Sequence, residues 1–342
     1  MRIEEFDYDL PRSLIAQYPS IQREESRLMV LHRKDGRIEH RIFRDIPEFL
    51  QAGDLLAMNN TRVLPARLIG KKETGGKCEI LLIPPSNGMN GESEVLIKGS
   101  GKWKEGSLIH FGRGIYGEIR RLKNGKGKVS FSHPGGVSDL LQKIGHIPLP
   151  PYIKREDEPL DRVRYQTIYA EKDGSIAAPT AGLHFTQPLL QSLQGRGVDI
   201  AWITLHIGIG TFAPVKAKEV EDHKMDAEWV EISQETGKKI EETKRSGGRV
   251  IAVGTTTTRA LESFSDPEGK IRSGRGLSSL FIHPPYRFRI IDGLITNFHL
   301  PKSTLIMLAC AFAGKGLLMK AYQEAVEKRY RFYSYGDAML IL

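Results

Sequence analysis

The pattern of apolar and turn residues changes twice along the chain, and this change limits its possible folds more than any other feature. Residues 61–147 hold short β-type runs, such as Glu79-Ile-Leu-Leu-Ile and Gly127-Lys-Val-Ser-Phe, separated by glycines and lysines. Asn124-Gly125 between two such runs is a hairpin signal. Short, evenly spaced strands joined by glycine turns are typical of a small β-barrel.

The residues on both sides of this segment alternate β-type runs with helical patterns. We predict strands at 198–205 and 249–253, and helices at 232–245, 255–264 and 315–329. Strand–helix alternation indicates an α/β domain. With 342 residues, the chain is also long for a single core. The predicted fold class is α/β, with an α/β domain (1–60 plus 148–342) that carries an inserted small β-barrel domain (61–147).

The positive charge is concentrated in the predicted barrel. The net charge of the chain is +9, and residues 61–150 hold 15 Lys and Arg against 7 Asp and Glu. A localised basic surface suits a polyanion such as a nucleic acid. A merely solvated surface explains the charge equally well.

The cellular context is predicted from what the chain lacks. The first residues have no apolar signal segment, and the apolar run that begins at Leu305 is about half as long as a membrane span requires. Cys78 and Cys310 are too few for a cysteine-held metal. We therefore expect a reduced, cytoplasmic protein that binds no metal and no membrane.

The run Gly254-Thr-Thr-Thr-Thr-Arg259 is the strongest local signal for a ligand. It joins a predicted strand to a predicted helix, where hydroxyls and free backbone N–H groups favour an anion. Arg259 adds a guanidinium one turn later. The alternative is a well-capped helix with a structural arginine, but four threonines exceed what one cap needs.

Two further loops combine glycine or small residues with a histidine. In His206-Ile-Gly-Ile-Gly-Thr-Phe212, the paired glycines permit close backbone approach to a ligand, and a tight bend is an equal interpretation. In Ala177-Ala-Pro-Thr-Ala-Gly-Leu-His184, small side chains leave room for a substrate before a helix capped by Thr186. A lone histidine such as His184 is more often structural.

Polar residues also gather near the C-terminus. Asn297 and His299 precede the apolar run at Leu305, and Tyr335 and Asp337 precede an apolar tail that predicts a buried final strand. Tyr335 and Arg331 are candidates for stacking on bases, although ordinary packing also accounts for such aromatic residues. The motifs of serine hydrolases, zincins and phosphate-loop NTPases are absent from the sequence.

Seven motifs in order resemble one known family over nearly the whole chain. They are Leu149-Pro-Pro-Tyr-Ile153, Tyr165-Gln-Thr-Ile-Tyr-Ala170, Ala177-Ala-Pro-Thr-Ala-Gly-Leu-His-Phe185, Leu205-His-Ile-Gly-Ile-Gly-Thr-Phe212, Gly254-Thr-Thr-Thr-Thr-Arg-Ala-Leu-Glu262, Thr296-Asn-Phe-His-Leu-Pro-Lys-Ser-Thr304 and Tyr330-Arg-Phe-Tyr-Ser-Tyr-Gly-Asp-Ala-Met339. This set resembles the S-adenosylmethionine:tRNA ribosyltransferase-isomerases of bacterial queuosine synthesis. Two positions depart from the family pattern, because Asp226 stands in place of a histidine and Pro285 in place of a glycine.

The resemblance implies an enzyme that moves and isomerises the ribosyl group of S-adenosylmethionine. The acceptor is 7-aminomethyl-7-deazaguanine at the wobble position of a tRNA with a GUN anticodon, and the products are epoxyqueuosine-tRNA, adenine and methionine. S-adenosylmethionine is then a consumed substrate, so no cofactor is expected. We also expect a monomer. An RNA-binding module without chemistry and an RNA methyltransferase are the alternatives.

The matching motifs supply the candidate site residues. For proton transfer they are His184, His206, His299 and Asp337. For binding the small substrate they are Thr180, Gly182, Gly208, Gly210, Thr211, Thr255, Thr256, Arg259, Asn297 and Tyr335. For holding tRNA they are Arg62, Arg67, Lys102, Lys104 and Arg331.

Overall fold

A large mixed sheet lies at the centre of the fold. The computed structural model describes residues 1–84, 92–99, 103–123, 125–208, 210, 215 and 217–342. Within these residues the nine strands of the sheet follow the spatial order β15 (Gly274–Ser278), β13 (Glu228–Ile232), β12 (Asp199–Leu205), β3 (Leu55–Asn59), β14 (Val250–Val253), β16 (Gly293–Asn297), β17 (Ala338–Ile341), β1 (Arg27–Leu31) and β2 (Ile38–Ile42).

The four central strands run in the same direction. β3 pairs in parallel with both β12 and β14, and β14 pairs in parallel with β16. β13 and β17 are antiparallel to their inner neighbours β12 and β16. The carboxyl ends of the four parallel strands therefore meet at one end of the sheet, where β17 begins.

Helices cover both faces of this sheet, as the alternation along β3 requires. Leu55 and Ala57 enter one apolar cluster, whereas Leu56 and Met58 enter the other. The first cluster takes side chains from α4 (Gln234–Arg245), α5 (Thr255–Ser263), α6 (Thr304–Ala313) and α7 (Lys315–Glu327). The second takes three leucines from α3 (Gln187–Gly195). This layering confirms the predicted α/β class.

The helix starts follow from the local sequence. Thr186, Ser233 and Ser303 are the N-cap residues of α3, α4 and α6, and each side chain accepts a hydrogen bond from a backbone N–H in the first turn. Shorter 3₁₀ turns span Ile3–Phe6, Arg12–Leu14, Arg23–Glu25, Phe43–Glu48, Thr180–His184 and Val220–Asp222. The helices predicted at 232–245, 255–264 and 315–329 are thus confirmed as α4, α5 and α7.

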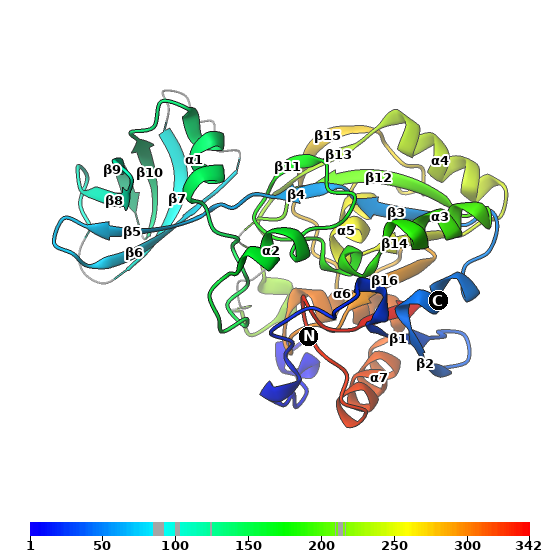
Figure 1. The fold of residues 1–342 in the computed structure, drawn as a ribbon. Helices are drawn as coiled ribbons and strands as arrows, with labels where there is room; N and C mark the ends of the chain where they lie inside the picture. The colour runs from blue at the N-terminus through cyan, green and yellow to red at the C-terminus, as the bar shows by residue number, and fades with distance from the viewer. Residues whose placement is uncertain (85–91, 100–102, 124, 209, 211–214, 216) are drawn as a thin grey trace.

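A separate closed barrel stands to one side of the sheet (Figure 1). Its described strands are β5 (Arg67–Lys72), β6 (Lys77–Leu82), β7 (Glu92–Gly99), β8 (Leu108–Gly112), β9 (Ile115–Lys123) and β10 (Lys126–Phe131). They close in the order β10-β7-β6-β5-β8-β9. Helix α1 (Gly136–Ile144) adds Leu140 and Leu141 to the barrel core. The predicted small β-barrel is confirmed.

Paired segments lead into and out of the barrel. β4 (Thr61–Val63) pairs with β11 (Lys172–Ser175) outside the barrel, and α2 (Pro159–Arg164) lies on the returning chain. The domain boundaries at 61 and 147 stay a prediction. Asn124 of the predicted hairpin lies outside the described residues.

Across the part of the chain that the structure describes, no single helix is long and apolar enough to cross a membrane. Helices α6 and α7 meet the criterion of length and composition only as a pair bent by 116°.

Candidate active site

The carboxyl ends of the parallel strands gather most of the motifs. Asn59 ends β3, His206 follows β12, Thr255 follows β14 and Asn297 ends β16. Asp337 stands at the same end, because β17 begins there in the opposite direction. This end of an α/β sheet is where ligands usually bind, since the loops and helix N-termini converge on it.

A small cavity opens at these strand ends, and we call it the inner cavity. Its polar lining includes five of the predicted site residues: Thr180, Thr255, Thr256, Asn297 and His299. Its aromatic lining consists of Tyr152, Phe298 and Tyr333. The fold therefore brings these distant motif segments together at one cavity.

Only the first two threonines of the four face the inner cavity. Gly254 has a φ of +95°, which turns the chain from β14 into α5. Thr257 and Thr258 donate their hydroxyls to the carbonyls of Val253 and Gly254 at 2.7 and 3.2 Å. Thr255 and Thr256 remain at the helix N-terminus, where backbone N–H groups and the helix dipole favour a negative group.

His299 is the predicted proton-transfer residue with an available ring nitrogen in the inner cavity. Its Nε2 lies 2.7 Å from Oγ1 of Thr296, and among the described residues no hydrogen bond reaches Nδ1. Burial lowers the pKa of His299 to about 3. The imidazole is therefore neutral at neutral pH, and when Nε2–H donates to Thr296, Nδ1 carries a lone pair that can accept a proton.

His184 has neither ring nitrogen free. Nδ1 lies 2.6 Å from the Ser26 hydroxyl, and Nε2 lies 3.2 Å from Nδ2 of Asn297. Burial lowers its pKa to about 4. Asn297 Nδ2 also donates to the backbone carbonyl of Asp337 at 3.4 Å. The amide oxygen Oδ1 of Asn297 is buried and has no hydrogen-bond partner in the described structure. His184 therefore orients the side-chain amide of Asn297 through the hydrogen bond between Nε2 and Nδ2.

Asp337 is the centre of a buried ion-pair network. The carboxylate is 1% exposed. It accepts hydrogen bonds from the backbone and guanidinium of Arg27 at 3.1 Å, and from those of Arg331 at 2.8–3.2 Å. Both oxygens thus accept hydrogen bonds from arginines, and Asp337 is not among the residues that line the inner cavity, so its role in proton transfer stays a prediction.

Arg259 also differs from its predicted position. Its guanidinium is paired with Glu228 at 2.7 Å, and both side chains are 4% exposed. Its Nε–H donates to the carbonyl of Leu280 at 3.0 Å. Arg259 is not among the residues that line the inner cavity, and the carboxylate of Glu228, at the start of β13, holds its guanidinium. The predicted anion contact is therefore left to Thr255, Thr256 and the helix N-terminus.

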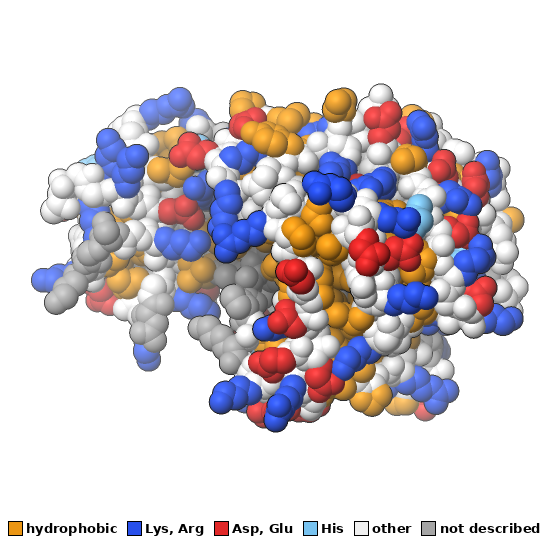
Figure 2. Space-filling view, turned by 90° about the horizontal axis from the view of Figure 1, so that it is seen from below, with side chains coloured by type: hydrophobic (Ala, Val, Ile, Leu, Met, Phe, Trp, Pro, Cys, Tyr) orange, Lys and Arg blue, Asp and Glu red, His pale blue; other side chains and the backbone are white. Residues whose placement is uncertain are grey.

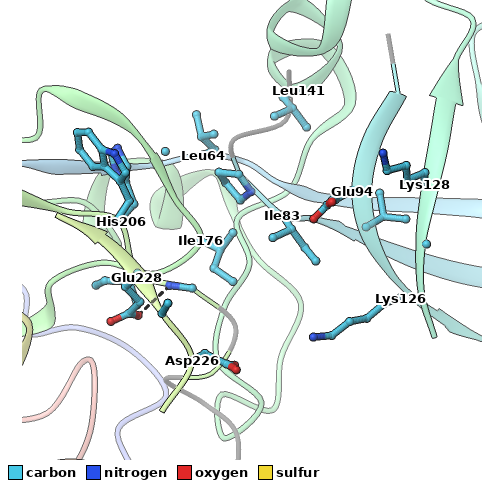
Figure 3. A pocket seen from close by; sticks show the side chains of 18 of the residues that line it. Leu64, Ile83, Glu94, Lys126, Lys128, Leu141, Ile176, His206, Asp226 and Glu228 are labelled. Atoms are coloured by element: carbon cyan, nitrogen blue, oxygen red, sulfur yellow. Dashed lines mark hydrogen bonds between the residues drawn. The ribbon is translucent and has the colours of Figure 1, made fainter. Parts of the chain in front are cut away.

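A much larger cleft of about 1420 Å³ separates the barrel from the α/β domain. His206, Asp226 and Glu228 lie on its α/β side, whereas Lys126 and Lys128 lie on the barrel side (Figure 3). The cleft and the inner cavity share Ile207 as a lining residue. A molecule in the cleft and a ligand in the inner cavity would therefore be neighbours.

The barrel side of the cleft is basic. It is lined by two acidic residues, Glu94 and Glu105, and by the five basic residues Arg120, Arg121, Lys123, Lys126 and Lys128. Of the five, only Arg120 has an ion-pair partner in the described structure, Glu118 at 2.7 Å. Figure 2 shows Lys and Arg side chains across the barrel surface. This wall matches the charge excess in the sequence.

The basic residues predicted to hold tRNA lie elsewhere. Arg67 pairs with Glu79 and Asp157, and Arg331 pairs with Asp337. Arg62 lies near Asp173, with 3.7 Å between the charged atoms. Lys104 is exposed but does not line the cleft, and Lys102 falls outside the described residues. The basic cluster on β9 and β10 is not among the residues named from the sequence, although it carries much of the local charge excess that the sequence shows.

The remaining predicted residues have mainly local functions in the structure. A Cβ on Gly182 would lie 2.0 Å from the Tyr169 hydroxyl, and one on Gly210 would lie 2.5 Å from Oδ2 of Asp226. Gly208 lines the cleft and donates its N–H to Glu228 at 3.0 Å. The Tyr335 hydroxyl donates to Asp161 at 2.7 Å. Thr211 lies outside the described residues.

Neither cysteine joins a metal cluster with the residues that the structure describes. Cys78 and Cys310 are buried and free. Among the described residues, no group of three His, Cys, Asp or Glu side chains is arranged to hold a metal ion.

The two buried histidines predict a loss of stability in acid. Their folded-state pKa values, about 4 for His184 and about 3 for His299, lie below the unfolded value of about 6.5. Below pH 6.5 the unfolded chain binds protons that the folded chain does not. The free energy of unfolding should then fall by up to about 1.4 kcal/mol per pH unit for each histidine. Urea denaturation between pH 7.5 and 5 measures this, and His184→Gln should flatten the slope; an unaltered slope contradicts the assignment.

Comparison with known proteins places the whole chain in one group. The model of the queuosine biosynthesis protein family matches residues 3–341. The S-adenosylmethionine:tRNA ribosyltransferase-isomerase of Halothermothrix orenii is 50% identical over 345 residues, covering 100% of both chains. That of Symbiobacterium thermophilum is 51% identical, again over 100% of both. A crystal structure of S-adenosylmethionine tRNA ribosyltransferase from Thermotoga maritima shares 39% identity, with a TM-score of 0.56 over 99% of this chain and 100% of that one.

Proposed function

The chain belongs to the queuosine biosynthesis protein family, and we propose that it transfers and isomerises the ribosyl moiety of S-adenosylmethionine onto a tRNA base. It is an S-adenosylmethionine:tRNA ribosyltransferase-isomerase. The observation that carries this proposal is the agreement with relatives of that activity over 100% of both chains. Those relatives favour neither a plain RNA-binding module nor a methyltransferase.

S-adenosylmethionine is proposed to bind as a consumed substrate with its methionyl end in the inner cavity, because the volume of about 80 Å³ holds only part of the molecule. Its carboxylate suits the N-terminus of α5 beside Thr255 and Thr256. Its sulfonium suits the aromatic lining formed by Tyr152, Phe298 and Tyr333. Oδ1 of Asn297 is a hydrogen-bond acceptor without a partner in the described structure, and an amino or hydroxyl group of this substrate would donate to it.

The tRNA is the proposed occupant of the cleft. Its backbone lies against the basic wall of the barrel, and its 7-aminomethyl-7-deazaguanine base approaches the inner cavity beside Ile207. The finer parts of the proposal are a GUN anticodon, action as a monomer and a cytoplasmic location. The products are epoxyqueuosine-tRNA, adenine and methionine.

The chemistry requires proton transfers that this cavity can support. The aminomethyl group is largely an ammonium at neutral pH and must lose a proton before its nitrogen attacks. The sulfonium acidifies the neighbouring ribose carbon, so a neutral base can remove a proton there. We assign one of these proton-accepting steps to His299, because it lines the cavity with an available nitrogen. Burial alone makes this imidazole a weak base, so the step requires the substrate carboxylate, bound in the same cavity, to raise its pKa.

The test is an incubation of the purified protein with labelled S-adenosylmethionine and a tRNA that bears the aminomethyl base. Release of adenine and methionine with ribosyl label on the tRNA is the expected result. Methyl label on the RNA would instead assign a methyltransferase. Binding of tRNA with no turnover would assign an RNA-binding module.

Charge reversal in the basic wall should weaken tRNA binding. Replacing Lys126 and Lys128 by glutamate is expected to raise the Kd for tRNA by about 10-fold or more at low salt, and to flatten the dependence of log Kd on log salt. Titration of labelled tRNA at several salt concentrations measures both quantities. Lys238→Glu on α4, an exposed helix away from the barrel (Figure 1), is the matched control. Equal effects of the two changes would contradict the placement.

A further inference from the structure

Three side chains form an apolar row on the α/β side of the cleft. Trp229 lies on β13, beside His206 at the end of β12 and opposite Leu277 on β15. The His206 and Trp229 rings are stacked, with centroids 5.0 Å apart and planes at 14°. Leu277 is 71% exposed, and all three line the cleft. A solvent-exposed leucine beside stacked rings is apolar surface that the fold itself does not use.

The imidazole of His206 is fixed by contacts with Thr61 and Gly174. Nδ1 of His206 lies 2.8 Å from the Thr61 hydroxyl. A Cβ on Gly174 would lie 2.7 Å from the imidazole, so the backbone there is pressed against the ring. Gly174 has a φ of +145°, a value that also favours glycine. Because these contacts fix the imidazole, the indole that stacks on it is oriented before any ligand arrives.

The opposite wall of the same cleft is the basic surface of β9 and β10. Arg121, Lys123, Lys126 and Lys128 have no ion-pair partner in the described structure. A cationic track that faces flat aromatic rings is the combination with which proteins hold single-stranded nucleic acid, because the cations hold phosphates while the rings stack on unpaired bases. A small metabolite needs no such extended cationic wall.

We propose that the row His206–Trp229–Leu277 is a stacking platform for an unpaired base of the substrate RNA, with Trp229 as its main contact. This inference rests on the proposed function for the identity of the RNA. The platform adjoins the inner cavity through Ile207. It therefore binds a base close to the one that reacts and helps to position the loop.

Alanine at Trp229 tests the proposal. Trp229→Ala should raise the Kd and the KM for tRNA on the order of 10-fold, whereas Trp229→Phe, which keeps an aromatic face, should retain most of the affinity. The KM for S-adenosylmethionine should stay unchanged in both. Trp202→Ala is the matched control, because Trp202 lies on the neighbouring strand, packs on Tyr169 and lines neither cavity.

A fluorescent base provides a readout that a purely structural effect would not reproduce. Anticodon stem-loop RNAs with 2-aminopurine at single loop positions should be quenched at one position by the wild-type protein, less by Trp229→Phe and not by saturating Trp229→Ala. A Kd for tRNA within twofold of wild type in Trp229→Ala would overturn the proposal. A higher KM for S-adenosylmethionine alone would do so as well, since it would place adenine on the indole. If wild-type protein binds RNA through Trp229 but releases no adenine, the proposed function fails while the platform stands.

Discussion

Replacing His299 by asparagine is expected to lower the turnover number for adenine release by about 10²- to 10⁴-fold, the usual contribution of a positioned proton acceptor. Asparagine keeps a polar group beside Thr296 but cannot accept the proton. The Kd for tRNA should remain at its wild-type value, because His299 lines the inner cavity and not the cleft. Single-turnover adenine release and tRNA titration measure the two quantities separately.

His32→Asn is the matched control for this experiment. His32 pairs with Glu39 at 2.8 Å and follows β1, which runs away from the candidate active site. Its replacement should leave turnover unchanged. His184→Gln should lie between the two, because His184 acts on the cavity only through Asn297. Wild-type turnover in His299→Asn would remove this residue from the mechanism.

Replacing Arg259 by methionine is expected to lower the free energy of unfolding by roughly 3–5 kcal/mol, the usual cost of leaving a buried charge without its counter-ion. Glu228 would remain buried without the guanidinium that lies 2.7 Å away in the native protein. Chemical denaturation followed by circular dichroism measures this change. The double variant Arg259→Met with Glu228→Gln should recover much of the loss, because the uncompensated charge is then removed.

An exposed pair on the adjoining strands provides the comparison. Arg275 contacts Glu231 at 2.7 Å, but its side chain is 71% exposed. Arg275→Met should therefore cost no more than about 1 kcal/mol. If Arg259 instead contacts the substrate, as the sequence motif predicts, the Arg259→Met variant should be as stable as the wild type. Only its KM for S-adenosylmethionine should then rise. That outcome would restore Arg259 as a substrate contact.

The types of the main elements were readable from the sequence. The run from Arg249 to Phe264 predicts a strand, a glycine turn and a helix, because each of these depends on neighbours a few residues away. The structure has β14, Gly254 and α5 there. The barrel was readable in the same way from its short strands and its charge.

The partners of the polar side chains were not readable, because they come from distant parts of the chain. Arg259 reads as an anion contact beside the threonines, but Glu228 on β13 neutralises it in the buried core. Asp337 reads as a proton-transfer candidate, but Arg27, 310 residues away, pairs with its carboxylate because β1 lies beside β17. The order of the strands in the sheet decides which distant charged residues form ion pairs, and a local sequence pattern does not determine that order.

By itself, the sequence determined the kinds of elements, the concentration of positive charge in the inserted segment and the family to which the motifs belong. Only the tertiary structure decided which lysines and arginines face the cleft, since closure of the barrel turns those of β9 and β10 toward the α/β domain. It also brought His206 and Trp229 together as stacked rings. The physical reason is that propensity and periodicity act over a few residues, whereas burial and pairing act between segments that only the folded sheet brings into contact.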